Sequence, residues 1–206
     1  MRGHSSNNVA LVAVGNGTLI LNSGAKVTMN TTNTGGFGGG IYVNGGTVEL
    51  NDGAEISENM VNNGSMYFLT AGGGIYVTNS GNINIRGGTI SANKLSGPSS
   101  GGTDGGGIYI AGNSTVTMTG GIISKNIISS GYRQRGGGIF VSDGSFMKRA
   151  ASGSSTSGII YGGTGVDANI ALQGNAVQRE WGTLKSRNST LGGYDEISTG
   201  NDVGWE

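Results

Sequence analysis

The sequence predicts an all-β protein, a single-stranded parallel β-helix with three short strands in each coil. The segment "GGGI" occurs four times, and its isoleucines, Ile41, Ile75, Ile108 and Ile139, are spaced by 34, 33 and 31 residues. A repeat of this length is typical of solenoids. Apolar residues alternate with polar ones in short runs and show no 3.6-residue period, which favours strands over helices.

Three strands are predicted in each repeat. In the first full repeat they begin at the glycine triplet 38–40, at the alternating pair Val48 and Leu50, and at Ile56, 15 residues after Ile41. A degenerate repeat without the triplet begins near residue 8. One such set of strands cannot bury its own apolar face, so we expect stacked coils that form three parallel sheets around one core, with right-handed crossovers.

The glycine triplets mark one corner of every coil. A chain that turns sharply at the same place in each coil needs residues that tolerate positive φ and close backbone contact. A phosphate-binding loop would require a helix after the glycines, and here a strand follows. We therefore expect the triplets to have a structural role.

A second corner carries asparagine. The third strand of each full repeat opens a tetrapeptide of the form Ile-Ser-x-Asn, and the degenerate first repeat has Val-Thr-Met-Asn over residues 27–30. Stacked asparagine side chains can form hydrogen-bonded ladders between equivalent strands. The predicted ladder residues are Asn30, Asn59, Asn93 and Asn126.

The repeat weakens after residue 144, which divides the chain into coils over 8–144 and a remainder over 145–206. Hints of coils return only at 159–161 and 174–177. A solenoid must blunt its open end against edge-to-edge growth. We expect residues 145–206 to form irregular final coils and a cap, with Trp181 and Trp205 as lids on the core.

Composition excludes several classes. Twelve Lys and Arg balance twelve Asp and Glu, so no basic field exists for nucleic acid. Cysteine is absent and His4 is the only histidine, so we expect no metal site and no cofactor. Glycine lacks a three-residue period, which excludes collagen. No signal peptide is visible, and no apolar stretch is long enough for a membrane helix.

The pairing of "GGGI" with a downstream Ile-x-x-Asn resembles the GGA(I/L/V) and FxxN repeats of the polymorphic outer-membrane protein type. The resemblance covers residues 8–145, with Gly in place of the family's Ala and Ile in place of its Phe. It implies a bacterial cell-surface or secreted location, associated with the outer membrane, and a role in adhesion.

Other β-helices are polysaccharide lyases or hydrolases, which need clustered carboxylates. The densest acidic cluster here is Glu49, Asp52, Glu55 and Glu58. Neighbouring coils do not continue it as a column, and we predict no catalytic residue. A carbohydrate-active enzyme with its groove at this cluster is the alternative, and a purely structural spacer is a third hypothesis.

Segments of changing length and content connect each ladder asparagine to the next glycine triplet. They leave from one corner, so we expect them to form loops along one edge, where recognition commonly resides. The expected partner is a host protein or glycan. Aromatic and arginine side chains are enriched in binding hot spots. Alternatively, Phe37, Met66 and Phe68 fold back over the wall of the helix. The candidate binding residues are Phe37, Tyr67, Phe68, Tyr132, Arg133 and Arg135.

Overall fold

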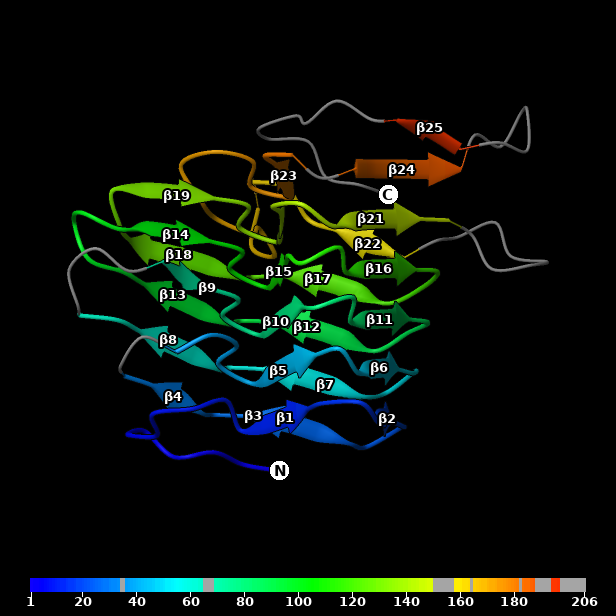
Figure 1. Cartoon of the computed structure of the whole chain (residues 1–206), viewed down its shortest axis with the longest axis horizontal. Coiled ribbons are helices and arrows are strands. Elements are labelled where there is room, and N and C mark those ends of the chain that lie inside the picture. Colours follow the sequence, from blue (N-terminus) through cyan, green and yellow to red (C-terminus); the bar gives the residue numbers. More distant parts are fainter. Residues whose placement is uncertain are drawn as a thin grey trace.

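The computed structural model is a stack of β-coils, and it describes residues 1–33, 36–64, 69–149, 158–163, 165–181, 183–187 and 194–196. All of the regular elements in these ranges are strands. Strands of successive coils pair in parallel, which confirms the predicted parallel β-helix. The coils are stacked from the N-terminal coil at one end to the C-terminal strands at the other (Figure 1).

Three sheets enclose the main core, and each takes one strand from each of the five coils that begin with β1, β5, β10, β15 and β20. The first core sheet contains β1 (Val12–Val14), β5 (Ile41–Asn44), β10 (Ile75–Thr78), β15 (Ile108–Ile110), β20 (Ile139–Val141) and β23 (Val177–Arg179). The second contains β2 (Thr18–Leu21), β6 (Thr47–Leu50), β11 (Asn82–Ile85), β16 (Thr115–Met118), β21 (Ser145–Lys148), β24 (Thr183–Arg187) and β25 (Tyr194–Glu196). The third contains β3 (Lys26–Thr28), β7 (Glu55–Ser57), β12 (Thr89–Ser91), β17 (Ile122–Ser124) and β22 (Ile159–Ile160).

The strands pair in the register that the repeat spacing predicts. Ile75 is paired with Ile41 on one side and with Ile108 on the other. In the third sheet Ile90 is likewise paired with Ile56 and Ile123. These side chains are completely buried, and each contributes about 1.5–3 kcal/mol through its removal from water. The core is therefore a column of equivalent apolar side chains repeated from coil to coil.

Each complete coil contains five strands, so the predicted number of three is too low. The segments expected to be loops begin and end in strands, which form a lobe beside the main core. The outgoing lobe sheet contains β4 (Thr31–Thr32), β8 (Met60–Asn62), β13 (Lys94–Ser96) and β18 (Ile127–Ser130). The returning lobe sheet contains β9 (Thr70–Ala71), β14 (Gly102–Asp104) and β19 (Arg133–Arg135).

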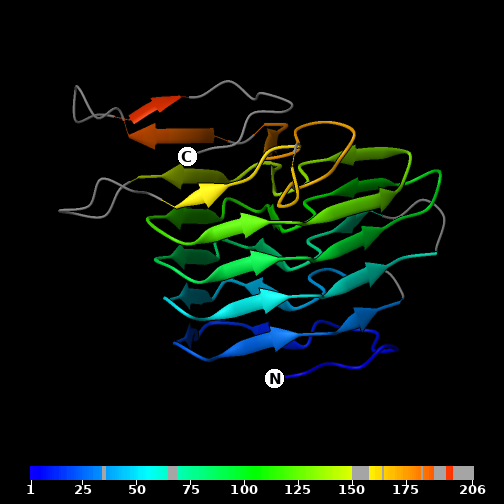
Figure 2. The same ribbon diagram turned by 180° about the vertical axis from the view of Figure 1, so that it is seen from behind.

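The lobe has its own small core, separate from the main one. Val61, Leu95 and Ile128 form an apolar row on the inner face of the outgoing sheet. The returning sheet contributes the buried threonines Thr70 and Thr103. Figure 2 shows the first four strands of the third core sheet, β3, β7, β12 and β17, each followed in the same coil by an outgoing lobe strand. The lobe is thus a continuation of the stack, not a set of separate loops.

The glycine triplets lie where the returning lobe strand enters the first core sheet, and two of their positions explain the choice of glycine. Gly72 has a φ of 67°, a region that strains any residue with a side chain. Gly73 lies against the next coil. A Cβ atom there would overlap the carbonyl oxygen of Gly106 and lie 3.2 Å from the carbonyl carbon of Lys94.

The stack continues further past residue 144 than the sequence pattern shows. β21 is paired with β16, and Ile160 of β22 is paired with Ile123. β24 extends the second core sheet in parallel, whereas β25 is antiparallel to β24. An antiparallel strand interrupts the repeating parallel edge, which is one way to stop growth of a solenoid.

The predicted tryptophan lids are not supported. Trp181 is 83% exposed and does not cover the core. Its backbone N–H donates to the carbonyl oxygen of Ser142 at 2.7 Å, so the turn is held while the indole faces outward. Trp205 lies outside the described residues.

Candidate binding edge and its supports

The outer edge of the lobe is formed by the turns between outgoing and returning strands, which lie along one side of the molecule (Figure 1). Residues 97–101 form the turn between β13 and β14, and residues 131–132 the turn between β18 and β19. Tyr132 N–H donates to the carbonyl oxygen of Gly101 at 3.1 Å, so these two turns are in contact. Tyr67 and Phe68, predicted for the preceding turn, lie outside the described residues.

Two predicted binding residues are accessible at this edge. Tyr132 is 78% exposed, and the Arg133 side chain is 47% exposed. The Arg133 guanidinium is 3.9 Å from the carboxylate of Asp104, a weak ion pair that leaves much of the group in water. An exposed aromatic ring and a partly exposed cation thus occupy adjacent residues, Tyr132 in the turn and Arg133 at the start of β19.

Arg135 is a correction to the predicted binding set. It is 7% exposed, and its guanidinium donates two hydrogen bonds to Asp104, at 2.9 and 2.8 Å. It also forms an ion pair with Glu180 at 3.0 Å and lies 4.1 Å from the centroid of the Phe140 ring. Strand pairing places Arg135 beside Asp104, which is why it is not on an exposed loop.

The pair of Arg135 and Asp104 also interacts with the C-terminal coil, through Glu180. The hydrogen bond from Arg135 lowers the pKa of the Glu180 carboxyl. Both Asp104 and Arg135 directly precede a glycine triplet, in successive coils. Opposite charges at equivalent positions of a repeat were the available sequence signal for this contact.

Phe37 also lies away from the outer edge. Its ring centroid is 4.6 Å from that of Tyr76. The backbone of Phe37 forms an isolated parallel β-bridge with Ala71 of the returning lobe sheet. Its ring faces the outer surface of the first core sheet. Phe37 therefore folds back over the wall of the β-helix, as the alternative to a binding role predicted.

A stacked aromatic column, which was not predicted from the sequence, covers that outer surface. The ring centroids of Tyr42 and Tyr76 are 5.6 Å apart, those of Tyr76 and Tyr109 5.1 Å, and those of Tyr109 and Phe140 5.5 Å. Each ring belongs to the residue between two inward side chains of the "GGGI" strand. Alternation along a strand places these residues outside, and the returning lobe sheet packs against them.

We expect the column to make stability sensitive to alkaline pH. Burial, with a smaller effect of Tyr109, raises the pKa of Tyr76 from its ordinary value of 10.0 to about 12. The neutral phenol is thus favoured in the folded state. Two pKa units correspond to at most about 2.7 kcal/mol, and solvent screening of the half-buried ring reduces this contribution. It is fully present below pH 10 and is lost as the pH rises through about 12. Tyr76→Phe should reduce the fall in melting temperature across this window; an unchanged fall would contradict the assignment.

The ladder asparagines form a buried hydrogen-bonded column at the passage from the third core sheet to the lobe. Asn59 Nδ2 donates to Asn93 Oδ1 at 3.1 Å, and Asn93 Nδ2 donates to Asn126 Oδ1 at 3.0 Å. Asn30 joins through its backbone N–H, which donates to Asn59 Oδ1 at 3.2 Å. A fifth member, Asn169, accepts from Asn126 Nδ2 at 2.9 Å. All five side chains are completely buried.

Asn169 was not predicted as a ladder residue because its coil is irregular. Elsewhere the asparagine follows the inward isoleucine by three residues, but Asn169 follows Ile160 by nine. Its Nδ2 nevertheless donates to the carbonyl oxygen of Ile123 at 3.0 Å, the same kind of contact that Asn126 makes with Ile90. The column therefore extends into the part of the chain where the repeat is not recognisable by eye.

The acidic cluster is divided between two sheets. Glu49 lies on β6 and forms hydrogen bonds to Arg86 at 2.7 and 3.0 Å. Glu55 lies on β7, and its carboxylate is 2.7 Å from the Lys26 ammonium, which lowers the pKa of Glu55. Among the residues whose positions are described, no group of three or more His, Cys, Asp or Glu could hold a metal ion.

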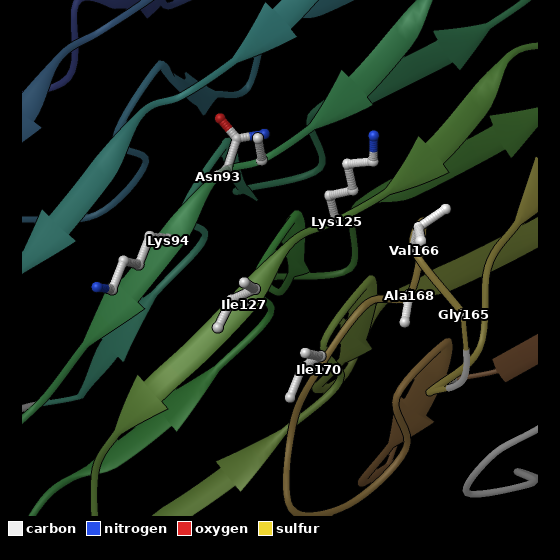
Figure 3. A pocket seen from close by; sticks show the side chains of 9 residues that line it. Asn93, Lys94, Lys125, Ile127, Gly165, Val166, Ala168 and Ile170 are labelled. Carbon is white, nitrogen blue, oxygen red and sulfur yellow. The ribbon is translucent and has the colours of Figure 1, made fainter.

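A shallow groove of about 350 Å³ lies where the third core sheet meets the lobe. Ile127, Ala168 and Ile170 contribute apolar side chains (Figure 3). The ammonium ends of Lys94 and Lys125 extend away from one another, and Lys125 pairs with Asp167 at 3.1 Å. No convergent set of polar groups defines a ligand for this groove.

Comparisons of the chain with protein-family models, with curated proteins and with solved structures gave no match. Surface location and adhesion therefore stay predictions that depend on the sequence resemblance. Within the described ranges, the structure contains no helix long and apolar enough to cross a membrane.

Proposed function

We propose that the chain is a non-catalytic binding module of a bacterial surface or secreted protein, which contacts a host protein or glycan through the outer edge of the lobe. The observation that carries this proposal is Tyr132, a large aromatic residue that is 78% exposed on a turn between two paired strands. Exposed aromatic side chains on ordered turns are typical of recognition surfaces.

The edge is supported by ordered structure on both sides of the turn. β18 pairs with β13, and β19 pairs with β14. The buried contact between Arg135 and Asp104 lies two residues beyond Arg133. A turn held in this way loses little conformational freedom when a partner binds, which favours affinity. The ion pairs of Glu49 and Glu55 make a catalytic groove at the acidic cluster the less favoured alternative.

The proposal is tested by a glycan-array and matrix-protein screen of the purified chain beside Tyr132→Ala. Truncation of a hot-spot tyrosine typically costs 2 kcal/mol or more, so we expect binding to weaken by roughly 30-fold or more. Arg133→Ser should weaken binding further and reduce its dependence on salt, because an exposed cation acts through screened attraction.

Trp181→Ala is the matched control, because Trp181 is also an exposed aromatic residue but lies outside the lobe turns. It should bind as the unaltered chain does. If Trp181→Ala loses binding while Tyr132→Ala retains it, the edge is not the recognition surface. If the unaltered chain binds nothing on either array, the spacer hypothesis is the better account.

A further inference from the structure

The aromatic column has an empty position at its N-terminal end. Ala13 is paired with Tyr42, and Tyr42 with Tyr76, so the outward positions of the first core sheet begin with alanine and continue with aromatic rings. Ala13 is exposed. The face of the Tyr42 ring that points toward the first coil therefore lacks the stacking partner that every later ring has on that side.

A cavity of about 430 Å³, open to solvent along one side, occupies this position. Ala13 and Tyr42 both line it, together with Phe37, Val9, Ala10 and Asn8. The volume is within the range of small-molecule sites and exceeds that of one or two fused aromatic rings. The cavity thus coincides with the slot that the next ring of the column would fill.

The lining favours a planar aromatic ring over a sugar. Phe37 packs beside Tyr76 and forms a side wall, while the alanine methyl groups and Val9 are aliphatic. Offset stacking of aromatic rings at centroid distances of about 4.5–7 Å is favourable, and the column itself has spacings of 5.1–5.6 Å. A pyranose would need several polar partners for its hydroxyl groups, and the side chains lining the cavity offer only Asn8 and the Tyr42 hydroxyl.

We propose that this slot binds a small planar aromatic molecule of one or two fused rings, stacked on Tyr42 above the Ala13 methyl group. The site is separate from the outer edge of the lobe, and the result of its test is independent of the proposed adhesion function. Its ligand would continue the stack of rings that the chain builds from Tyr42 to Phe140.

The test is a titration of the whole chain, carrying ¹³C-labelled alanine methyl groups, with indole as the probe. Ring currents should shift the Ala13 and Ala10 methyl signals in a saturable way, with a Kd of about 1 mM for a ligand of this size. Methyl β-glucopyranoside, the sugar probe, should bind at least tenfold more weakly. Shifts that fail to saturate, or equal binding of both probes, would overturn the proposal.

Ala13→Tyr supplies the missing ring from within the chain. It should lower indole affinity at least tenfold and raise the melting temperature, a combination that simple loss of structure cannot produce. Ile20→Tyr is the matched control, because Ile20 is exposed on the outer face of β2 in the same coil, away from the cavity. It should leave the affinity within twofold.

Tyr42→Leu keeps apolar bulk but removes the stacking surface, and it should weaken indole binding at least threefold. This second variant keeps the proposal testable if Ala13→Tyr perturbs β1. Undiminished indole binding by either Ala13→Tyr or Tyr42→Leu contradicts the assignment of the slot.

Discussion

Gly73→Ala is expected to destabilise the protein by about 3–5 kcal/mol, a large share of the roughly 5–15 kcal/mol that keeps an ordinary domain folded. The added methyl group would overlap the carbonyl oxygen of Gly106 in the next coil and crowd the backbone of Lys94. Both neighbours are main chain, so no side chain can move aside. Relief requires separation of two coils, which would break parallel hydrogen bonds in the first core sheet. Chemical denaturation monitored by circular dichroism measures the loss.

Gly17→Ala is the control for this substitution. No heavy atom lies within 4 Å of a Cβ atom built at Gly17, and Gly17 is not among the glycines with positive φ. We expect a change within about 1 kcal/mol, of the size that backbone entropy alone produces. Equal losses at Gly17 and Gly73 would show that close contact between coils is not the reason for the triplet.

Asn93→Ala is expected to cost about 3–4 kcal/mol, the second large effect. The Asn93 Oδ1 accepts from both the backbone N–H and the Nδ2 of Asn59, and its Nδ2 donates to Asn126 and to the carbonyl oxygen of Ile56. Truncation leaves several completely buried groups without a partner, and each such group costs about 1–3 kcal/mol. Urea unfolding of the variant gives the measurement.

Asn62→Ala serves as the matched control, because Asn62 is exposed on β8, three residues beyond the ladder residue Asn59. Its replacement should change the free energy of unfolding by about 0.5 kcal/mol or less. Asn93→Asp adds a sharper test. A buried carboxylate without a cation is costly, so this variant should gain stability on acidification as the carboxyl is protonated. Equal effects of Asn93→Ala and Asn62→Ala would contradict a structural role for the column.

The main core was predictable because one residue in two is apolar over each strand and the strands recur at nearly constant spacing. A slip of one residue in register would have placed polar residues such as Glu49 inside, and the recurring glycine triplets fix the remaining choice, so the alignment of Ile41, Ile75 and Ile108 had a single solution. The ladder was predictable for the same reason, as far as the spacing from isoleucine to asparagine holds. At Asn169 that spacing fails, and the prediction failed with it.

The lobe was not predictable from apolar alternation. Leu95 is the only buried apolar residue of β13, and the buried residues of β14 are the polar Thr103 and Asp104. Polar strands of this kind form because neighbouring coils supply their hydrogen bonds, a tertiary effect that no single segment encodes. Arg135 was assigned to the wrong environment for this reason. Its partner Asp104 is 31 residues away in the sequence.

Backbone amide hydrogen exchange, measured residue by residue, tests directly whether an ordered lobe presents the recognition turns. We predict strong protection at Leu95 in β13 and at Asp104 in β14, while Ser99 and Ser100 at the exposed turn between them exchange quickly. Fast exchange throughout 94–104, at the rate of an unstructured peptide, would contradict an ordered lobe and would show that these segments are loops.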